Sequence, residues 1–192
     1  MAATERFEDM GWLAWGVLAA PAFWLMVSCV YGKAAGVIRA TRLAGWAALA
    51  SAVLAAVSLL ALGPRTLDVA TWQGYGIALR LDGLSVVMLS LVALMGRFVS
   101  GFSFNYLDGD AGQTSFMRRL GRTLAAVMLL VTAANAVWLW CAWVATSLAL
   151  HQLLVFYPER PAARAAARKK FIVARLGDAL LGAALVWACL EN

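Results

Sequence analysis

One long, uncharged and largely apolar run, residues 123–157, most constrains what this chain can fold into. As a single helix the run would be about 52 Å long, whereas the hydrocarbon core of a bilayer is only about 30 Å thick. The run must therefore break, and TAANAVW (132–138) is its only polar interruption in the middle. We predict two spans, at about 120–134 and 137–157, joined by a very tight turn.

Four other apolar segments have the length of a membrane span. We place them at about 11–31, 43–62, 84–104 and 170–189. The sequence is 64% hydrophobic and 14% charged, whereas a soluble domain is typically about 25% charged. We therefore predict an all-α integral membrane protein of about six transmembrane helices, with helices 1–2 within residues 1–70 and helices 3–6 within residues 71–192.

Basic residues fall mainly in every second loop of this arrangement. Eleven lie in the first, third and fifth loops, whereas three lie on the opposite side. Because cytoplasmic loops are enriched in Lys and Arg, we expect both termini to face away from the cytoplasm. Tryptophans near the predicted span ends, Trp138 and Trp140 among them, are assigned to the aromatic belt at the membrane interface and to no binding role.

The sequence gives no sign of a soluble-type enzyme site. Cys29, Cys141 and Cys189 lie far apart inside apolar runs, without a CxxC motif or a Cys/His cluster. Asp108-Gly109-Asp110 offers too few oxygen ligands for a metal and predicts a turn. We expect no cofactor, metal or nucleic acid to be bound by this chain, and no catalysis by the chain alone.

The last span, FIVARLGDALLGAALV (171–186), carries two charges, Arg175 and Asp178. A charge at the centre of a membrane costs about 2.5–3.5 kcal/mol on insertion scales. Their i,i+3 spacing places the two side chains on one helix face, close enough to pair. They form either a structural ion pair or part of a proton or ion relay, because intramembrane ionisable groups mark such pathways.

Two further polar residues lie inside predicted spans. His151, the only histidine, can gain or lose a proton near neutral pH, and is either a satisfied core residue or a relay member. Arg97 needs a carboxylate, a carbonyl or water as its partner, and Asp178 is one candidate. The hypothetical proton pathway therefore contains Arg175, Asp178, His151 and Arg97.

The fifth loop, YPERPAARAAARKKF, is strongly basic. Arg160, Arg164 and Arg168 recur every four residues, and Lys169 and Lys170 follow. Its Pro161 suits the start of a helix. We expect this basic loop either to touch anionic lipid or to dock a partner protein.

Three segments carry a resemblance to a known family: ALRLDGLSVVMLSLVALMGRFVSGFSFNYLDGD, NAVWLWCAWVATSLALHQLLVFY and AARKKFIVARLGDALL. In order and spacing over residues 78–187 they resemble the antiporter-like membrane subunits of respiratory complex I and Mrp antiporters, and the subunit L type most closely. Within that superfamily, VSGFSFNYLDGDAGQ and SLALHQLLVFYPERPAA look most like DabB, the membrane subunit of bacterial inorganic carbon transporters.

The resemblance implies a proton-conducting subunit in the bacterial inner membrane. It also implies a DabA-like cytoplasmic partner that binds zinc, and a proton flow that drives conversion of CO2 to bicarbonate. Arg175 and Asp178 match the family's R-x-G-D motif. The alternatives are a subunit L-like component of an NADH–quinone oxidoreductase and a non-conducting membrane scaffold for a cytoplasmic partner.

The sequence departs from the family in two ways. Val144 stands where the complex I type has a proton-carrying glutamate in the fifth span, and this difference favours DabB. His151, seven residues later on the same helix face, is a candidate substitute for that glutamate. Family members have well over a dozen spans built on two inverted five-helix repeats, whereas this sequence has six. We therefore expect a truncated gene product, a fragment or one half of a split subunit.

Overall fold

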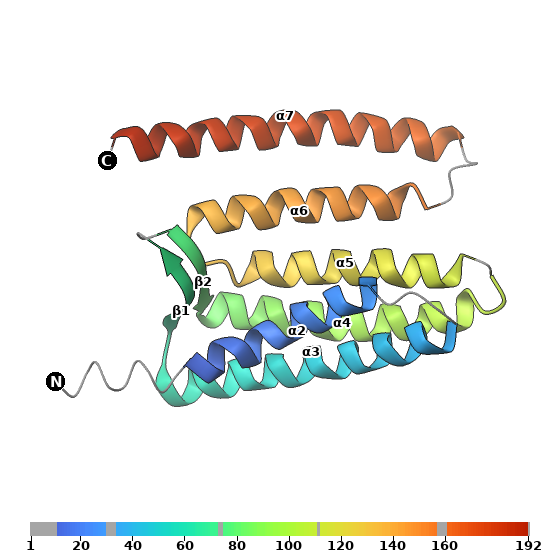
Figure 1. The fold of residues 1–192 in the computed structure, drawn as a ribbon, viewed down its shortest axis with the longest axis horizontal. Helices are drawn as coiled ribbons and strands as arrows, with labels where there is room; N and C mark the ends of the chain where they lie inside the picture. The colour runs from blue at the N-terminus through green and yellow to red at the C-terminus, as the bar shows by residue number, and fades with distance from the viewer. Residues whose placement is uncertain (1–10, 30–33, 73–74, 111, 157–160, 192) are drawn as a thin grey trace.

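The computed structural model describes residues 11–29, 34–72, 75–110, 112–156 and 161–191. Within these residues, six helices run alternately in opposite directions and lie roughly side by side (Figure 1). In chain order they are α2 (Gly11–Cys29), α3 (Ala34–Leu62), α4 (Gly83–Tyr106), α5 (Gln113–Val131), α6 (Ala136–Leu154) and α7 (Pro161–Glu191). This arrangement confirms the predicted all-α class with about six membrane helices.

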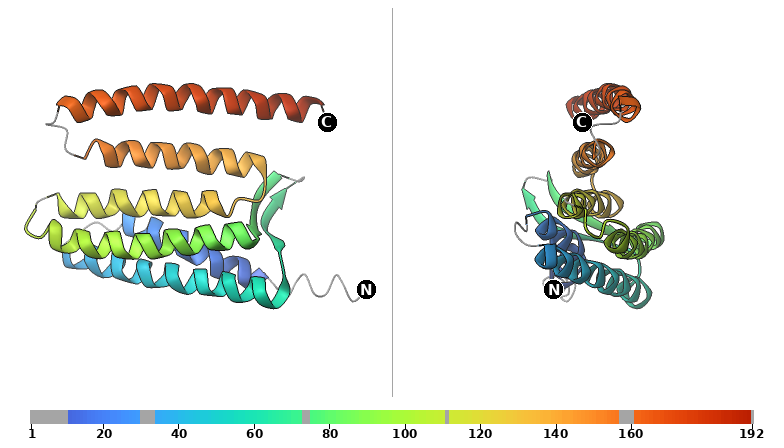
Figure 2. Two further views of the ribbon diagram at one scale, coloured as in Figure 1. Left: turned by 180° about the vertical axis from the view of Figure 1, so that it is seen from behind. Right: turned by 90° about the vertical axis from the view of Figure 1, so that its right-hand side faces the viewer.

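The helices form a packed cluster from which two of them extend as a row. α2, α3, α4 and α5 pack on one another, and the end-on view of Figure 2 shows α6 and then α7 stacked beyond α5. α7 packs mainly against α6, and only 6% of its most apolar 18-residue stretch is buried. The faces of α7 that point away from α6 are therefore open.

Length and composition support a multi-pass membrane protein. Within the described residues, segments of α3, α4, α6 and α7 are long and apolar enough to cross a membrane. The apolar part of α2, Leu13–Cys29, is slightly shorter. α5 starts earlier than predicted, because its basic first turns, expected in a loop, are helical.

The tight turn predicted inside the long apolar run is confirmed. α5 ends at Val131 and α6 begins at Ala136. Asn135 caps α6, because its side-chain Oδ1 accepts a hydrogen bond from the backbone N–H of Trp138 at 2.6 Å. The polar residue that marked the break in the sequence therefore satisfies one of the free N–H groups at the start of a helix.

A β-hairpin between α3 and α4 was not predicted. Strand β1 (Arg65–Trp72) pairs antiparallel with β2 (Tyr75–Leu81), after Gly63 ends α3 with a positive φ of 76°. The hairpin also holds the α5–α6 turn, because the N–H of Arg80 donates to the carbonyl of Thr132 at 2.8 Å. It therefore caps one end of the bundle (Figure 1).

Small residues let the helices of the cluster approach closely. Four alanines of α3 are at most 4% exposed: Ala44, Ala48, Ala52 and Ala55. On α5, a Cβ added to Gly121 would lie only 2.9 Å from the backbone oxygen of Trp24 on α2. The Ala and Gly residues at these contacts thus allow close packing of membrane helices.

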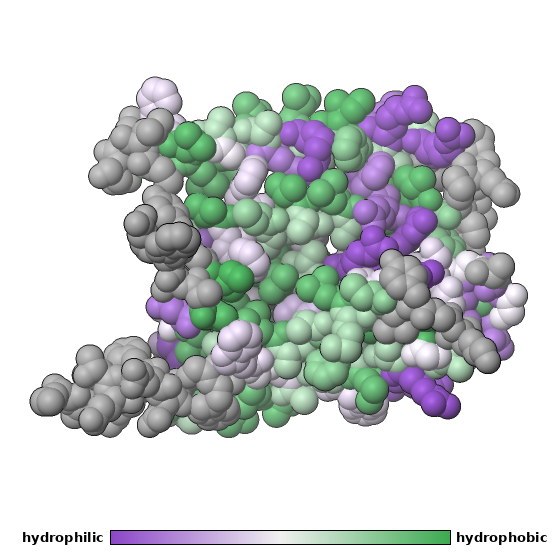
Figure 3. All heavy atoms as spheres, in the orientation of Figure 1, coloured by the Kyte–Doolittle hydropathy of each residue, from purple (hydrophilic) through white to green (hydrophobic). Residues whose placement is uncertain are grey.

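The basic residues gather at the end of the bundle opposite the hairpin. Three groups that were predicted in loops lie instead in the first turns of α3, α5 and α7: Arg39 and Arg42; Arg118, Arg119 and Arg122; Arg164, Arg168, Lys169 and Lys170. These three helices begin at the same end, and Figure 3 shows hydrophilic side chains concentrated toward that end of the view. The orientation of this end toward the cytoplasm stays a prediction.

Candidate functional site

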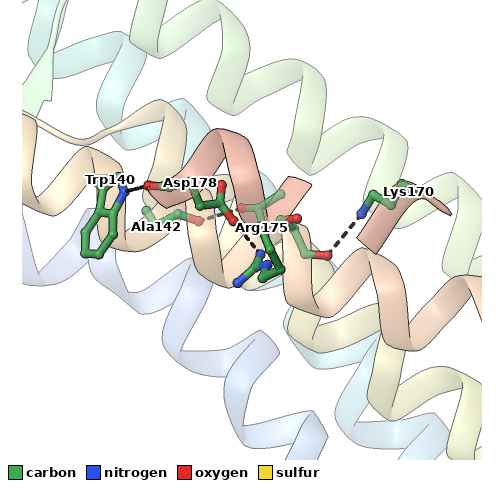
Figure 4. Close-up of polar contacts among 7 residues, drawn as sticks. Trp140, Ala142, Lys170, Arg175 and Asp178 are labelled. Carbon is green, nitrogen blue, oxygen red and sulfur yellow. Dashed lines mark hydrogen bonds and ion pairs between the residues drawn. The ribbon is translucent and has the colours of Figure 1, made fainter. Parts of the chain in front are cut away.

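Arg175 and Asp178 pair on the face of α7 that meets α6 (Figure 4). Nη2 of Arg175 lies 2.5 Å from Oδ2 of Asp178. The Asp178 side chain is only 7% exposed, whereas that of Arg175 is 30% exposed. The ion pair predicted from the i,i+3 spacing is therefore present, with its acid buried in the seam between the helices.

Trp140 of α6 fixes the position of this turn of α7. Its indole Nε1 donates a hydrogen bond to the backbone carbonyl of Asp178 at 2.9 Å (Figure 4). The indole lies so close to α7 that a Cβ added to Gly182 would be 3.0 Å from Cζ2 of Trp140. Trp140 was expected only in the aromatic belt, but it lies between α6 and α7 and fixes the position of Asp178 along the axis of α7.

Lys170 belongs to α7 rather than to a loop. α7 begins at Pro161, as the proline predicted, and continues through the alanine-rich basic stretch because alanine is the strongest helix former. Nζ of Lys170 donates to the backbone carbonyl of Ser147 on α6 at 3.1 Å (Figure 4). This cation is therefore directed into the α6–α7 seam.

A cavity of about 560 Å³ lies between α5, α6 and α7. Most of its lining is apolar, yet both Asp178 and Lys170 reach it. Eight residues of helix separate these two, which is about 12 Å along the axis. The carboxylate of Asp178 and the amino group of Lys170 thus share one cavity inside the membrane-spanning part of the protein.

His151 and Arg175 both lie near the ring of Phe171 on α7. The ring centroid of His151 is 4.8 Å from that of Phe171, and Cζ of Arg175 lies 5.4 Å from the centroid of the same ring. Nδ1 of His151 is buried without a hydrogen-bond partner in the described part of the chain. His151 and Val144 are both absent from the lining of the cavity that Asp178 reaches.

Arg97 lies apart from the other three residues of the hypothetical pathway. Its Cζ is 5.1 Å from the ring of Trp46 on α3, a distance at which a cation and an aromatic face attract each other. A Cβ added to Gly45 would lie 2.8 Å from Cδ of Arg97. The suggested contact between Arg97 and Asp178 is wrong, because α5 and α6 lie between α4 and α7 (Figure 2).

The other described residues of the predicted basic loop lie on the surface. Arg164, Arg168 and Lys169 are exposed on the first turns of α7. Arg160 lies outside the described residues. The exposed group can meet lipid or a partner protein, and its role stays a prediction.

No metal centre forms among the described residues. Nowhere in that part of the chain do three His, Cys, Asp or Glu side chains come together. Asp108-Gly109-Asp110 forms the predicted turn, with a positive φ of 80° at Gly109. Oδ1 of Asp110 accepts the backbone N–H of Gly112 at 2.6 Å, so this carboxylate is used within the turn.

Trp140 was missed as a site residue, and Lys170 was predicted in the basic loop but not beside Asp178. A signal for Lys170 was present, because Lys170, Ala174 and Asp178 follow at four-residue steps and therefore share a helix face. No comparable signal existed for Trp140, since its contact depends on how α6 and α7 are rotated against each other.

Comparisons with known proteins support the resemblance drawn from the motifs. Residues 74–117 match the family model described as NADH-ubiquinone oxidoreductase (complex I), chain 5 N-terminus. The probable inorganic carbon transporter subunit DabB2 of Halothiobacillus neapolitanus is 36% identical over 181 residues, which are 88% of this chain and 33% of that protein. NADH-quinone oxidoreductase subunit L of Escherichia coli K12 is 33% identical over 148 residues, which are 73% of this chain and 24% of that protein.

The fold has a solved counterpart as well. A chain of the membrane-bound sulfane sulfur reductase, an archaeal respiratory membrane complex, matches with a TM-score of 0.74 and 17% identity. The match covers 92% of this chain and 36% of that one, so the chain spans about a quarter to about a third of the length of these relatives. The resemblance to the antiporter-like membrane subunits of the subunit L and DabB type is therefore confirmed.

Proposed function

We propose that this chain conducts protons as a membrane segment of an inorganic carbon transport complex, and that Asp178 carries the proton. The observation that supports this most is a carboxylate that is only 7% exposed, ion-paired, and in reach of a cavity between three helices. Ionisable groups are rare inside membranes and mark proton relays when they line a cavity.

The chemistry of the site allows two states of Asp178. In one, the carboxylate is ionised and paired with the Arg175 guanidinium, as the structure has it. In the other, Asp178 holds a proton and Arg175 turns toward the face of Phe171, over which its Cζ already lies at 5.4 Å. Exchange between these states loads and releases one proton at the wall of the cavity.

Lys170 supplies a second cation for this exchange. It lies about two helical turns from Asp178 along the same face of α7, and both reach one cavity. A proton that passes between them through water in the cavity needs no further titrating side chain on α6. The absence of an acid at Val144 is therefore compatible with conduction.

The names of the relatives support a coupling to inorganic carbon. Proteins named as inorganic carbon transporter subunits match 88% and 54% of this chain. We place the chain in the bacterial inner membrane, with the basic end in the cytoplasm and both termini on the other side. At the cytoplasmic end, a DabA-like zinc-binding partner meets the exposed Arg164, Arg168 and Lys169.

A second candidate function is a proton-translocating, subunit L-like component of an NADH–quinone oxidoreductase. The family model over residues 74–117 and the match to subunit L of Escherichia coli favour it. The proton chemistry at Asp178 would be the same, but the driving reaction would be quinone reduction in partner subunits.

Growth of a carbonic-anhydrase-deficient bacterium in air tests the proposal. The gene, expressed with its natural neighbours, should restore growth, and Asp178→Asn should abolish the rescue while the protein still accumulates in the membrane. Asp108→Asn removes an exposed loop carboxylate and is the matched control, expected to rescue fully. No rescue by the unaltered genes, or full rescue by Asp178→Asn, would contradict the proposal.

A further inference from the structure

A second cavity, of about 550 Å³, lies between the basic start of α5 and the end of α6. α5 lines it with a stripe that repeats at helical spacing: Ser115, Arg118, Arg119 and Arg122. α6 contributes His151, Gln152 and Val155. The cavity therefore brings three guanidinium groups and an imidazole together, and no carboxylate is among the described residues that line it.

Part of this charge already has a structural use. Nη1 of Arg119 donates to the backbone carbonyls of Gln152 and Val155, at 2.7 and 3.4 Å, and so caps the end of α6. Nη1 of Arg122 donates to Oε1 of Gln152 at 2.7 Å. These acceptors are all neutral, so they do not balance the positive charges of Arg119 and Arg122.

Two buried nitrogen atoms at the cavity also lack partners within the described part. They are Nε of Arg122 and Nδ1 of His151. A buried polar atom without a hydrogen bond is unfavourable by about 1–3 kcal/mol, so most such atoms in proteins have a partner or mark a binding site. Guanidinium groups match phosphate oxygens especially well, because their N–H groups form a planar fork.

The surroundings of the cavity indicate where an oxyanion would come from. It lies at the basic end of the membrane helices, which is the depth of lipid headgroups. Leu150 and Leu154 of α6, 42% and 48% exposed, lie within one helical turn of His151 and offer an apolar surface for acyl chains. Basic pockets between membrane helices on the cytoplasmic side bind the headgroups of anionic lipids.

We propose that this basic cavity is an oxyanion site, which the phosphate of an anionic phospholipid headgroup fills in the membrane. The bound phosphate neutralises Arg119 and Arg122 and ties α5 to α6 beside His151. The proposal is independent of proton conduction, because none of the cavity residues except His151 belongs to the hypothetical pathway.

Native mass spectrometry of the purified chain in a neutral detergent tests the proposal. Titration with dioleoyl phosphatidylglycerol should show one tightly bound lipid, held about tenfold more tightly than dioleoyl phosphatidylcholine, whose choline cation the arginines repel. Arg122→Gln should weaken phosphatidylglycerol binding by about tenfold, which is the usual effect of losing one charge-assisted contact. Arg80→Gln removes an equal charge from an exposed position on the hairpin, at the other end of the bundle, and should leave binding unchanged.

Two further variants separate charge from packing. Arg122→Lys keeps the charge and should retain most of the affinity, whereas Gln152→Ala removes only the neutral partner of Arg122 and should retain it too. Equal loss in Gln152→Ala and Arg122→Gln would overturn the proposal, because the effect would then be packing. Equal affinity for the two lipids would also overturn the lipid proposal. In that case, a rise in Tm of the wild type but not of Arg122→Gln on addition of sodium phosphate or bicarbonate would assign the cavity to a free oxyanion.

Discussion

Arg175→Met tests whether the ion pair on α7 stabilises the fold as a unit. Methionine keeps a long, flexible side chain and good helix propensity while removing the charge. The change leaves Asp178 without a cation at 2.5 Å, in a position where its side chain is only 7% exposed. Asp178→Leu in the same chain then removes the stranded acid.

The size of the effect follows from the burial of the two side chains. Removing one partner of a fully buried ion pair destabilises a protein by about 3–5 kcal/mol. Arg175 is 30% exposed, which reduces its share, so we expect Arg175→Met to lower the free energy of unfolding by about 2–3 kcal/mol. The double variant should recover most of this loss, because replacing a whole buried pair with apolar side chains is often close to neutral.

Thermal unfolding in detergent, followed by circular dichroism or by a fluorescent reporter of aggregation, measures these effects. By the scaling for chains of this size, Arg175→Met should lower Tm by about 5–10 °C, and the double variant by much less. Val173→Met, a substitution at a 70% exposed position of the same helix, is the control and should have little effect. A double variant as unstable as Arg175→Met would refute the reasoning, since the loss would then not come from an unpaired acid.

Three other changes test local features of the fold. Asp82 caps α4, and the hydrogen bond that its carboxylate accepts from a backbone N–H lowers its pKa. The stabilising effect of this cap is therefore present above about pH 4 and is lost as the pH falls. The amide of Asp82→Asn caps at any pH, so the unfolding curves of this variant and the wild type should diverge in acid. Asn135→Ala removes the cap of α6 and should lower stability by about 1 kcal/mol, whereas Asn135→Ser should not, in the same unfolding assay. Gly121→Ala places a Cβ 2.9 Å from the Trp24 backbone oxygen and should lower Tm, whereas Gly36→Ala, with open space around it, should leave Tm unchanged or raise it.

The helices were predictable because their signals are local. Apolar runs of span length and the charge asymmetry of the loops depend only on neighbouring residues, and Asn135 marked a helix start by its own hydrogen-bonding chemistry. The hairpin over 65–81 was missed because it is held partly by contacts with a distant part of the chain. Its backbone bonds to the α5–α6 turn join residues about 50 positions apart in the sequence, such as Arg80 and Thr132.

The candidate site was predictable only within one helix. The pairing of Arg175 with Asp178 follows from helix geometry, so their spacing was sufficient. The contact of Trp140 with the Asp178 carbonyl depends on the rotation of α6 against α7, which no local pattern specifies. The partner of Arg97 could not be predicted either, since a mid-span charge has several candidate partners until the order of the helices is known.

The most direct test of the central claim is proton uptake by proteoliposomes that contain the complete complex. We predict that Asp178→Asn abolishes uptake driven by an imposed membrane potential, while Asp178→Glu, which keeps a titrating carboxylate, retains a measurable part of it. The assembled complex must be present in equal amount in all three preparations, as measured by native gel electrophoresis. Uptake by Asp178→Asn at the wild-type rate would show that protons cross without this carboxylate, and would contradict the account.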